Sequence, residues 1–115
     1  MPPNSQAYEL VLYVTEDGNA PFEDWFDGLD TAAALKVRTA LARIETGNLG
    51  DVKPVGQGVS ERRIPFGPGY RVYFGQDGNT LVILLCGGTK KRQSNDIEQA
   101  KRHWDDYKNR KKQGH

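Results

Sequence analysis

The sequence contains few of the residues from which metal sites, disulfide frameworks and membrane spans are built. One cysteine and two histidines among 115 residues leave no Cys/His spacing typical of a zinc site, and an internal disulfide is impossible. No apolar run approaches the roughly 20 residues that cross a bilayer, and the first ten residues lack the basic and apolar regions of a signal peptide. We therefore expect a cytoplasmic protein that uses no metal or other cofactor and does not enter a membrane.

Motifs for other common kinds of catalysis are missing as well. Cys86 lies inside the apolar run LVILLC, which predicts a buried small hydrophobic side chain rather than a nucleophile. His103 stands on the last expected helix without a nucleophile motif. The segments Gly67-Pro68-Gly69 and Gly87-Gly88 lack the patterns of phosphate-binding loops, so we assign most of these glycines to turns.

Length and charge indicate a single domain with an uneven charge distribution. The composition, 37% hydrophobic and 27% charged, suits one hydrophobic core, and we place one domain over residues 1–115 with a flexible tail at about 111–115. Residues 1–50 hold eight acidic and three basic side chains, whereas residues 86–115 hold four acidic and nine basic ones. This basic C-terminal region favours a polyanionic partner, because clustered cations gain affinity through counterion release at phosphates.

The N-terminal third of the chain predicts one strand and two helices. Residues 8–14 alternate and are rich in strand formers, and a turn follows at residues 17–19. Asn19 is expected to cap a short helix with Pro21 in its first turn. Asp30 is expected to cap a second, amphipathic helix that ends at Gly47.

The remainder predicts three strands and a closing helix. The strands are residues 60–64, 70–74 and 80–86, and the two short connections between them suit antiparallel hairpins. Residues 81–85 are apolar at every position, which indicates a central strand that is covered on both faces. A helix with a capping box from Asn95 to Glu98 follows. The expected fold class is α+β, with the order βααβββα, a mainly antiparallel sheet, two N-terminal helices packed on it and a C-terminal helix.

Strand alternation gathers cations on one face of the predicted sheet. If Ile64 points inward, Glu61 and Arg63 point outward, and on the next strand Arg71 and Tyr73 share that outward face. Four more polar residues follow the central strand, and one lysine lies in the loop before the sheet; they are Lys90, Lys91, Arg92, Gln93 and Lys53. We expect a basic concavity that contains an aromatic side chain.

Such a site is suited to RNA cleavage without a metal. The ribose 2′-OH attacks the adjacent phosphate, and guanidinium groups stabilise the negative charge that grows in the transition state. A tyrosine such as Tyr73 can stack on an unpaired base. Either a lysine among the other cations or Glu61 can accept the 2′ proton. The alternative for each charge is an ordinary ion pair on a solvated sheet, for example Glu61 with Arg63.

Long strings in this chain resemble a known family. The strings GNLGD, VGQGVSERRIPFGPGYRVYF and LLCGGTKKRQSNDI, between residues 47 and 97, are similar to the RelE/ParE superfamily of toxins from type II toxin-antitoxin systems. They are more similar still to its HigB-like branch of addiction module killer proteins. Trp25 and Trp104 extend the resemblance over nearly the whole chain.

The resemblance implies a fold and an activity. Members have a βααβββ core, often with a closing helix, and the RelE-like members cut mRNA in the ribosomal A site without a metal. It implies an adjacently encoded helix-turn-helix antitoxin as a partner and mRNA on the ribosome as the target. The implied catalytic cations are Arg63, Arg71 and Lys90 or Lys91, and the expected RNA-binding residues are Lys53, Glu61, Tyr73, Arg92 and Gln93.

The chain departs from the family pattern at three places. Lys91-Arg92-Gln93 stands where RelE-like nucleases commonly have a tyrosine or histidine, and Thr89 replaces a frequent acid. Arg62 occupies an inward strand position that is usually leucine. Two other functions stay open on the same fold: inhibition of DNA gyrase in the manner of ParE, and a non-catalytic role in repression of an operon together with a DNA-binding antitoxin.

Overall fold

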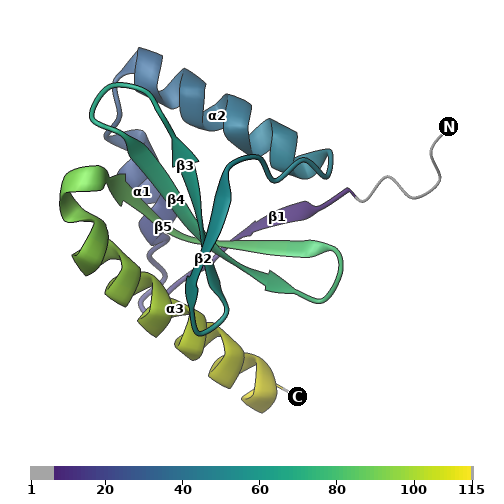
Figure 1. Ribbon diagram of the computed structural model, residues 1–115. Helices are drawn as coiled ribbons and strands as arrows, with labels where there is room; N and C mark the ends of the chain where they lie inside the picture. Colours follow the sequence, from purple (N-terminus) through teal and green to yellow (C-terminus); the bar gives the residue numbers. More distant parts are fainter. Residues whose placement is uncertain (1–6, 115) are drawn as a thin grey trace, which may run out of the picture.

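Residues 7–114, which the computed structural model describes, form a five-stranded mixed sheet with helices on both faces (Figure 1). The α+β class is therefore as predicted. The elements in chain order are β1 (Glu9–Leu12), α1 (Pro21–Asp27), α2 (Thr31–Glu45), β2 (Val52–Gly56), β3 (Val59–Ile64), β4 (Tyr70–Asp77), β5 (Leu81–Thr89), the 3-10 turn η1 (Lys90–Arg92) and α3 (Gln93–Gln113).

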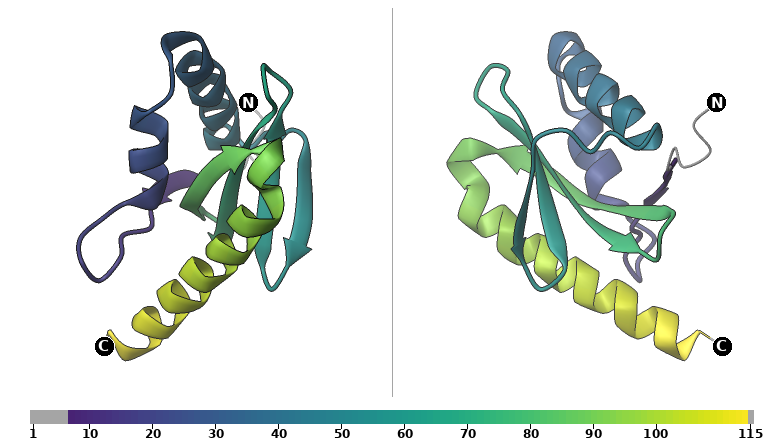
Figure 2. Two further views of the ribbon diagram at one scale, coloured as in Figure 1. Left: turned by 90° about the vertical axis from the view of Figure 1, so that its left-hand side faces the viewer. Right: turned by 45° about the vertical axis from the view of Figure 1, so that its right-hand side comes forward.

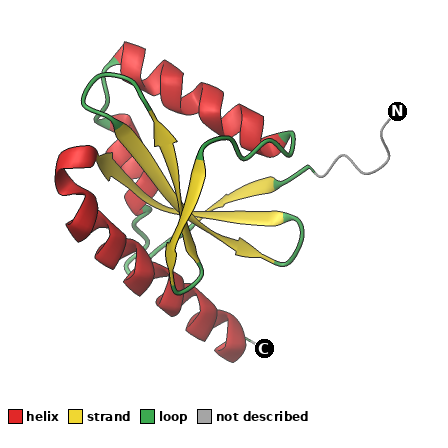
Figure 3. Cartoon of the chain, in the orientation of Figure 1, coloured by secondary structure: helices red, strands yellow, loops and turns green. Residues whose placement is uncertain are grey.

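The sheet has the strand order β1-β5-β4-β3-β2. Figure 3 shows its strands in yellow and the helices in red. Strands β2 to β5 form an antiparallel meander, and β1 pairs in parallel with β5, with Glu9 opposite Leu81. Residues 81–85 were expected to form a central strand covered on both faces. Residues 82–85 are buried and β5 is an interior strand, but it lies beside the edge strand β1, and β4 is the middle strand of the sheet. Cys86 is buried too, and burial raises the pKa of its thiol to about 12.

Two separate apolar clusters hold the helices against the sheet, one on each face. Figure 2 shows the helices and the sheet from two further sides. The first joins α1 and α2 to residues such as Val72 and Phe74 of β4. The second joins Ala100 and Trp104 of α3 to Tyr73 of the same strand. Because successive side chains of a strand point to opposite faces, β4 contributes to both clusters. The sheet is therefore covered by helices on both sides.

The helix boundaries follow some of the expected caps and not others. The Asp30 cap is confirmed, since its side chain accepts a hydrogen bond of 2.8 Å from the backbone of Ala33. The Asn19 cap is wrong, because Ala20 occupies the N-cap position of α1. The capping box at Asn95 is also wrong: η1 runs directly into α3, so Asn95 already lies inside the helix.

The C-terminal residues also differ from the expected tail. Helix α3 continues to Gln113, and the Lys111 ammonium lies 2.6 Å from the Asp77 carboxylate of β4. Residues 111–113 are therefore helical rather than a flexible tail, and His115 lies outside the described residues. Within residues 7–114, no helix has the combination of length and apolar character that a bilayer crossing needs.

The sequence analysis did not predict strand β2, and it assigned the pair Gly87-Gly88 to a turn. Strand β2 contains Pro54, which indicated a loop, but it is an edge strand, where a missing N–H donor is tolerated. Gly87 and Gly88 lie inside β5 and not in a turn. A Cβ at Gly88 would stand 1.8 Å from Asp96 Oδ2 of α3, so the small residue allows α3 to approach the sheet closely.

We expect Gly88→Ala to lower the free energy of unfolding by about 1–3 kcal/mol, the usual cost of overpacking. The added methyl group would displace the first turns of α3 through Asp96. Urea denaturation measures the change, and Gly28→Ala is the matched control because a Cβ there meets nothing closer than 3.6 Å. Shortening the clashing side chain in Gly88→Ala/Asp96→Ala should recover most of the loss, and a double variant as unstable as the single one would contradict this role.

Candidate functional site

Three of the predicted catalytic cations line one pocket at the same end of three neighbouring strands. Arg63 belongs to β3, Arg71 to β4, and Lys90 begins η1 directly after β5. The pocket has a volume of about 380 Å³. The backbone N–H of Lys90 donates a hydrogen bond of 2.8 Å to the carbonyl of Gly69, which fixes η1 against the β3–β4 turn. Strand ends and a backbone hydrogen bond thus position the three cations.

The strand register explains why the two arginines meet. Arg63 stands directly opposite Arg71 in the antiparallel β3–β4 pair, and opposite residues share a face of the sheet. Like charges in this arrangement repel each other, and each arginine has a carboxylate partner. Arg63 Nη2 lies 3.0 Å from Asp51 Oδ1, and Arg71 Nη1 lies 3.3 Å from Glu61 Oε2. The bond to Asp51 raises the pKa of Arg63.

Glu61 is the centre of a buried hydrogen-bond network beneath α3. Its side chain is 0% exposed, and Oε2 accepts hydrogen bonds from Arg71, from the Tyr73 hydroxyl at 3.1 Å and from Gln93 Nε2 at 2.9 Å. Oε1 has no partner among the described residues. The network joins β3, β4 and the start of α3, and it holds the Arg71 guanidinium at the pocket wall.

Glu61 and Tyr73, which we expected to contact RNA, are buried in the structure. Alternation placed both side chains on the correct face of the sheet, but α3 covers that face there, and Tyr73 is fully buried among Cys86, Ala100 and Trp104. Burial and the neighbouring Glu61 carboxylate raise the pKa of the Tyr73 hydroxyl, which therefore stays a protonated donor. Gln93 is partly buried and serves the same network. These residues position others and do not form an open surface.

The remaining predicted cations are exposed and do not line the pocket. Lys53 is in β2 opposite Glu61, two strands away from Arg71. Lys91 and Arg92 complete η1 after Lys90. They do not line the pocket, so Lys90 is the lysine that the structure groups with the two arginines.

Two residues with polar side chains, Asp51 and Tyr70, line the pocket but were not among the predicted site residues. Asp51 comes from the loop before β2 and binds Arg63. Tyr70 begins β4, is partly exposed, and packs beside Phe66 with ring centroids 6.4 Å apart. The sequence signal for Tyr70 is its place next to the turn at residues 66–69. Its ring also lies 6.3 Å from that of Trp25, so the Tyr70 side chain packs in the first apolar cluster, on the opposite face of the sheet from Arg71.

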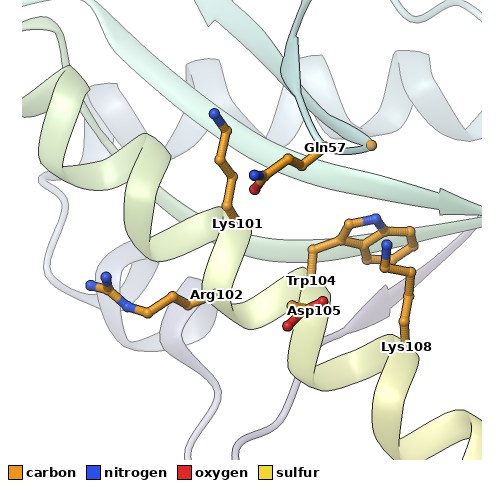
Figure 4. A pocket seen from close by; sticks show the side chains of 7 residues that line it. Gln57, Lys101, Arg102, Trp104, Asp105 and Lys108 are labelled. Carbon is orange, nitrogen blue, oxygen red and sulfur yellow. The ribbon is translucent and has the colours of Figure 1, made fainter.

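A larger pocket of about 560 Å³ lies between the β2–β3 turn and α3 (Figure 4). It contains none of the predicted site residues. Trp104 forms its floor, close to Gly58 and Gly75, where a Cβ would stand 2.6 and 2.5 Å from the indole. Lys101 and Lys108 border it from the helix, and the Lys108 ammonium lies 5.7 Å from the Trp104 ring centroid. These glycines serve the packing of α3.

Comparison with known proteins identifies a relative. The chain is 46% identical over 81 residues to an uncharacterized protein from Haemophilus influenzae, a match that covers 70% of this chain and 82% of the relative. No protein-family model matches the chain. With this identity and coverage, the chain belongs to the same family as the Haemophilus influenzae protein.

Proposed function

We propose that this protein is the toxin of a type II toxin-antitoxin system, a metal-independent endoribonuclease that cuts mRNA on the ribosome. The observation that carries the proposal is the convergence of Arg63, Arg71 and Lys90 on one pocket. The order of the elements supports a RelE-like fold of the HigB-like branch, since it equals βααβββα with the edge strand β2 added. The basic region from residue 86 onward supports a nucleic-acid target.

The proposed reaction is a transesterification within the RNA. The 2′ oxygen forms a bond to the adjacent phosphorus, the bond from phosphorus to the 5′ oxygen breaks, and a 2′,3′-cyclic phosphate and a 5′-hydroxyl result. Arg63 and Arg71 donate hydrogen bonds to the non-bridging oxygens as their charge grows.

Proton transfer falls to the remaining groups of the pocket. Glu61 is excluded as the base that touches RNA, because it is fully buried and its Oε2 atom already accepts three hydrogen bonds. Lys90 and Asp51 are the exposed titratable groups beside the arginines. The proposed partner is an adjacently encoded helix-turn-helix antitoxin, and the proposed substrate is mRNA on the ribosome.

Mapping RNA 5′ ends after brief induction tests this function. We expect new 5′-hydroxyl ends within translated messages, and their loss when initiation of translation is blocked beforehand. On purified ribosome complexes, EDTA at levels that leave the ribosomes intact should not slow cleavage. An unchanged pattern of RNA ends during a growth arrest would contradict the proposal, as would a divalent-ion requirement of the toxin itself.

A second candidate function, inhibition of DNA gyrase by binding, is favoured by one observation. Both arginines of the pocket already have carboxylate partners, which is the arrangement of structural ion pairs. In that case growth arrest would occur without new RNA ends, and the purified protein would inhibit supercoiling by gyrase. A chain that leaves growth, RNA ends and supercoiling unchanged would instead fit a non-catalytic role in operon repression with the antitoxin.

A further inference from the structure

A small pocket on the other face of the sheet collects three cations and no acid. It lies between α2 and the β3–β4 hairpin and has a volume of about 210 Å³. Its charged lining residues are Lys36 and Arg43 of α2 and Arg62 of β3. Arg62 and Arg63 are neighbours in β3, so their side chains point to opposite faces of the sheet. This pocket therefore contains a different arginine from the pocket that contains Arg63 and Arg71, and the two pockets adjoin at Ile64 and Pro65, which line both.

Arg62 is an unusual residue for its position. It is 7% exposed, between Glu61 and Arg63, and it packs beneath the loop before β2, where a Cβ at Gly50 would stand 2.7 Å from its guanidinium group. One Nη1–H donates to the Arg63 carbonyl. The Nε–H is buried and has no hydrogen-bond partner among residues 7–114. A buried cation with a free donor is unfavourable unless an anion compensates it.

Among residues 7–114, no acidic side chain forms an ion pair with any of the three cations. The ion pairs among the described residues involve Arg63, Arg71, Arg110 and Lys111, and none includes Lys36, Arg43 or Arg62. Asp51 is the acid whose charge acts on Arg62, but its Oδ1 atom is bound to Arg63. Burial lowers the pKa of Arg62, and the charge of Arg43 lowers it further, which agrees with an incompletely compensated site.

The side chains around the cations suit a compact oxyanion. Lys36 Nζ lies 5.3 Å from the ring centroid of Phe66, so its ammonium is held at the edge of the pocket. Arg43 stands on the same face of α2, seven residues or about two helical turns further on. Two guanidinium forks and one ammonium form the donor set that proteins use for phosphate.

We propose that this pocket binds a phosphate group, with Arg62 as its buried anchor and Arg43 and Lys36 at its mouth. The phosphate is either free, as orthophosphate or a mononucleotide, or part of an RNA backbone. Both sources present the same tetrahedral oxyanion to the same donors. The site adjoins the proposed cleavage pocket but uses other cations, and its occupancy does not depend on whether the chain cuts RNA.

The first test measures thermal unfolding of the full-length chain in orthophosphate and in chloride at equal ionic strength and pH. We expect phosphate to raise the Tm of the natural protein. Arg62→Leu and Arg43→Gln should each weaken phosphate binding roughly tenfold to a hundredfold, as loss of a charged hydrogen bond does. Arg38→Gln is the matched control: it removes the same charge from α2, but Arg38 lies over Phe26, 5.7 Å from its ring centroid, and does not line the pocket.

The second test separates the two sources with a short oligonucleotide that lacks the attacking 2′-hydroxyl. Protection by orthophosphate that is lost in Arg62→Leu and Arg43→Gln supports a site for free phosphate. Oligonucleotide binding that is weakened in the same variants, without protection by orthophosphate, supports a backbone phosphate. If Arg62→Leu does not fold, Arg43→Gln and Lys36→Gln are compared with the natural protein and with Arg38→Gln instead. Equal responses of the natural protein, the pocket variants and Arg38→Gln to both ligands would overturn the proposal.

Discussion

Arg63→Ala should abolish growth arrest and lower the rate of RNA cleavage by about 10²- to 10³-fold, the usual effect of removing one transition-state hydrogen-bond donor. The variant should remain folded. The Arg63 side chain is 43% exposed and its partner Asp51 is 53% exposed, so solvent screens their ion pair. When Arg63 is removed, water can solvate the Asp51 carboxylate. Arg63 is thus the cleaner of the two arginines for a test of the site.

Growth after induction, mapped RNA ends and a urea titration are the three measurements for Arg63→Ala. Arg102→Ala is a suitable control, because Arg102 is also an exposed arginine but lines the other pocket against α3. The expected result is loss of cleavage in the first variant only, with similar urea midpoints in both. Full toxicity of Arg63→Ala at natural expression levels would remove this pocket as the cleavage site.

Arg71→Ala should lower the free energy of unfolding by about 3–5 kcal/mol, because it leaves the buried Glu61 carboxylate without its cation. Glu61 is 0% exposed in the folded chain. The double variant Glu61→Gln/Arg71→Ala should be more stable than Arg71→Ala, since a neutral amide removes the unpaired charge. Urea denaturation of the natural protein, both single variants and the double variant gives the coupling energy. Additive losses would show that the pair does not act as a unit.

Loss of toxicity in Arg71→Ala alone therefore has two physical causes to separate. One is the loss of the guanidinium that binds the phosphate, and the other is the lower stability of the fold. Arg71→Lys separates them, since a lysine keeps a positive charge beside Glu61 but lacks the planar fork that binds a phosphate with two hydrogen bonds. We expect Arg71→Lys to retain most of the stability and to lose most of the cleavage. If Arg71→Lys is as unstable as Arg71→Ala, the planar guanidinium group, and not its charge alone, is what stabilises the Glu61 network.

Side-chain alternation was enough to predict that Arg63 and Arg71 share a face of the sheet. A register shift of one residue would move every buried side chain of a strand to the other face, so the apolar pattern fixes the pairing. Side-chain alternation does not predict which face of the sheet a later helix covers. The apolar stripe of α3 indicated that this helix packs against an apolar surface. It did not indicate that this surface is the part of the sheet with Tyr73 and Glu61.

Local signals also misled the prediction where tertiary packing decides. Pro54 argued against a strand, yet β2 is an edge, where only one side of the backbone is paired. Gly87 and Gly88 indicated a turn, but they are strand residues whose missing side chains make room for Trp25 on one face and Asp96 on the other. No spacing in the sequence reports such a contact between distant elements.

The parallel pairing of β1 with β5 sets the order in which the molecule can be completed during its own synthesis. Glu9 pairs with Leu81, and the first strand therefore leaves the ribosome long before its partner exists. Contacts of such high sequence separation form slowly, because a long loop must close before they stabilise the chain. Lys90 follows β5 immediately, so the pocket it shares with Arg63 and Arg71 is assembled only after most of the protein has been translated. A nascent chain cut short before β5 would carry both arginines and lack the pocket.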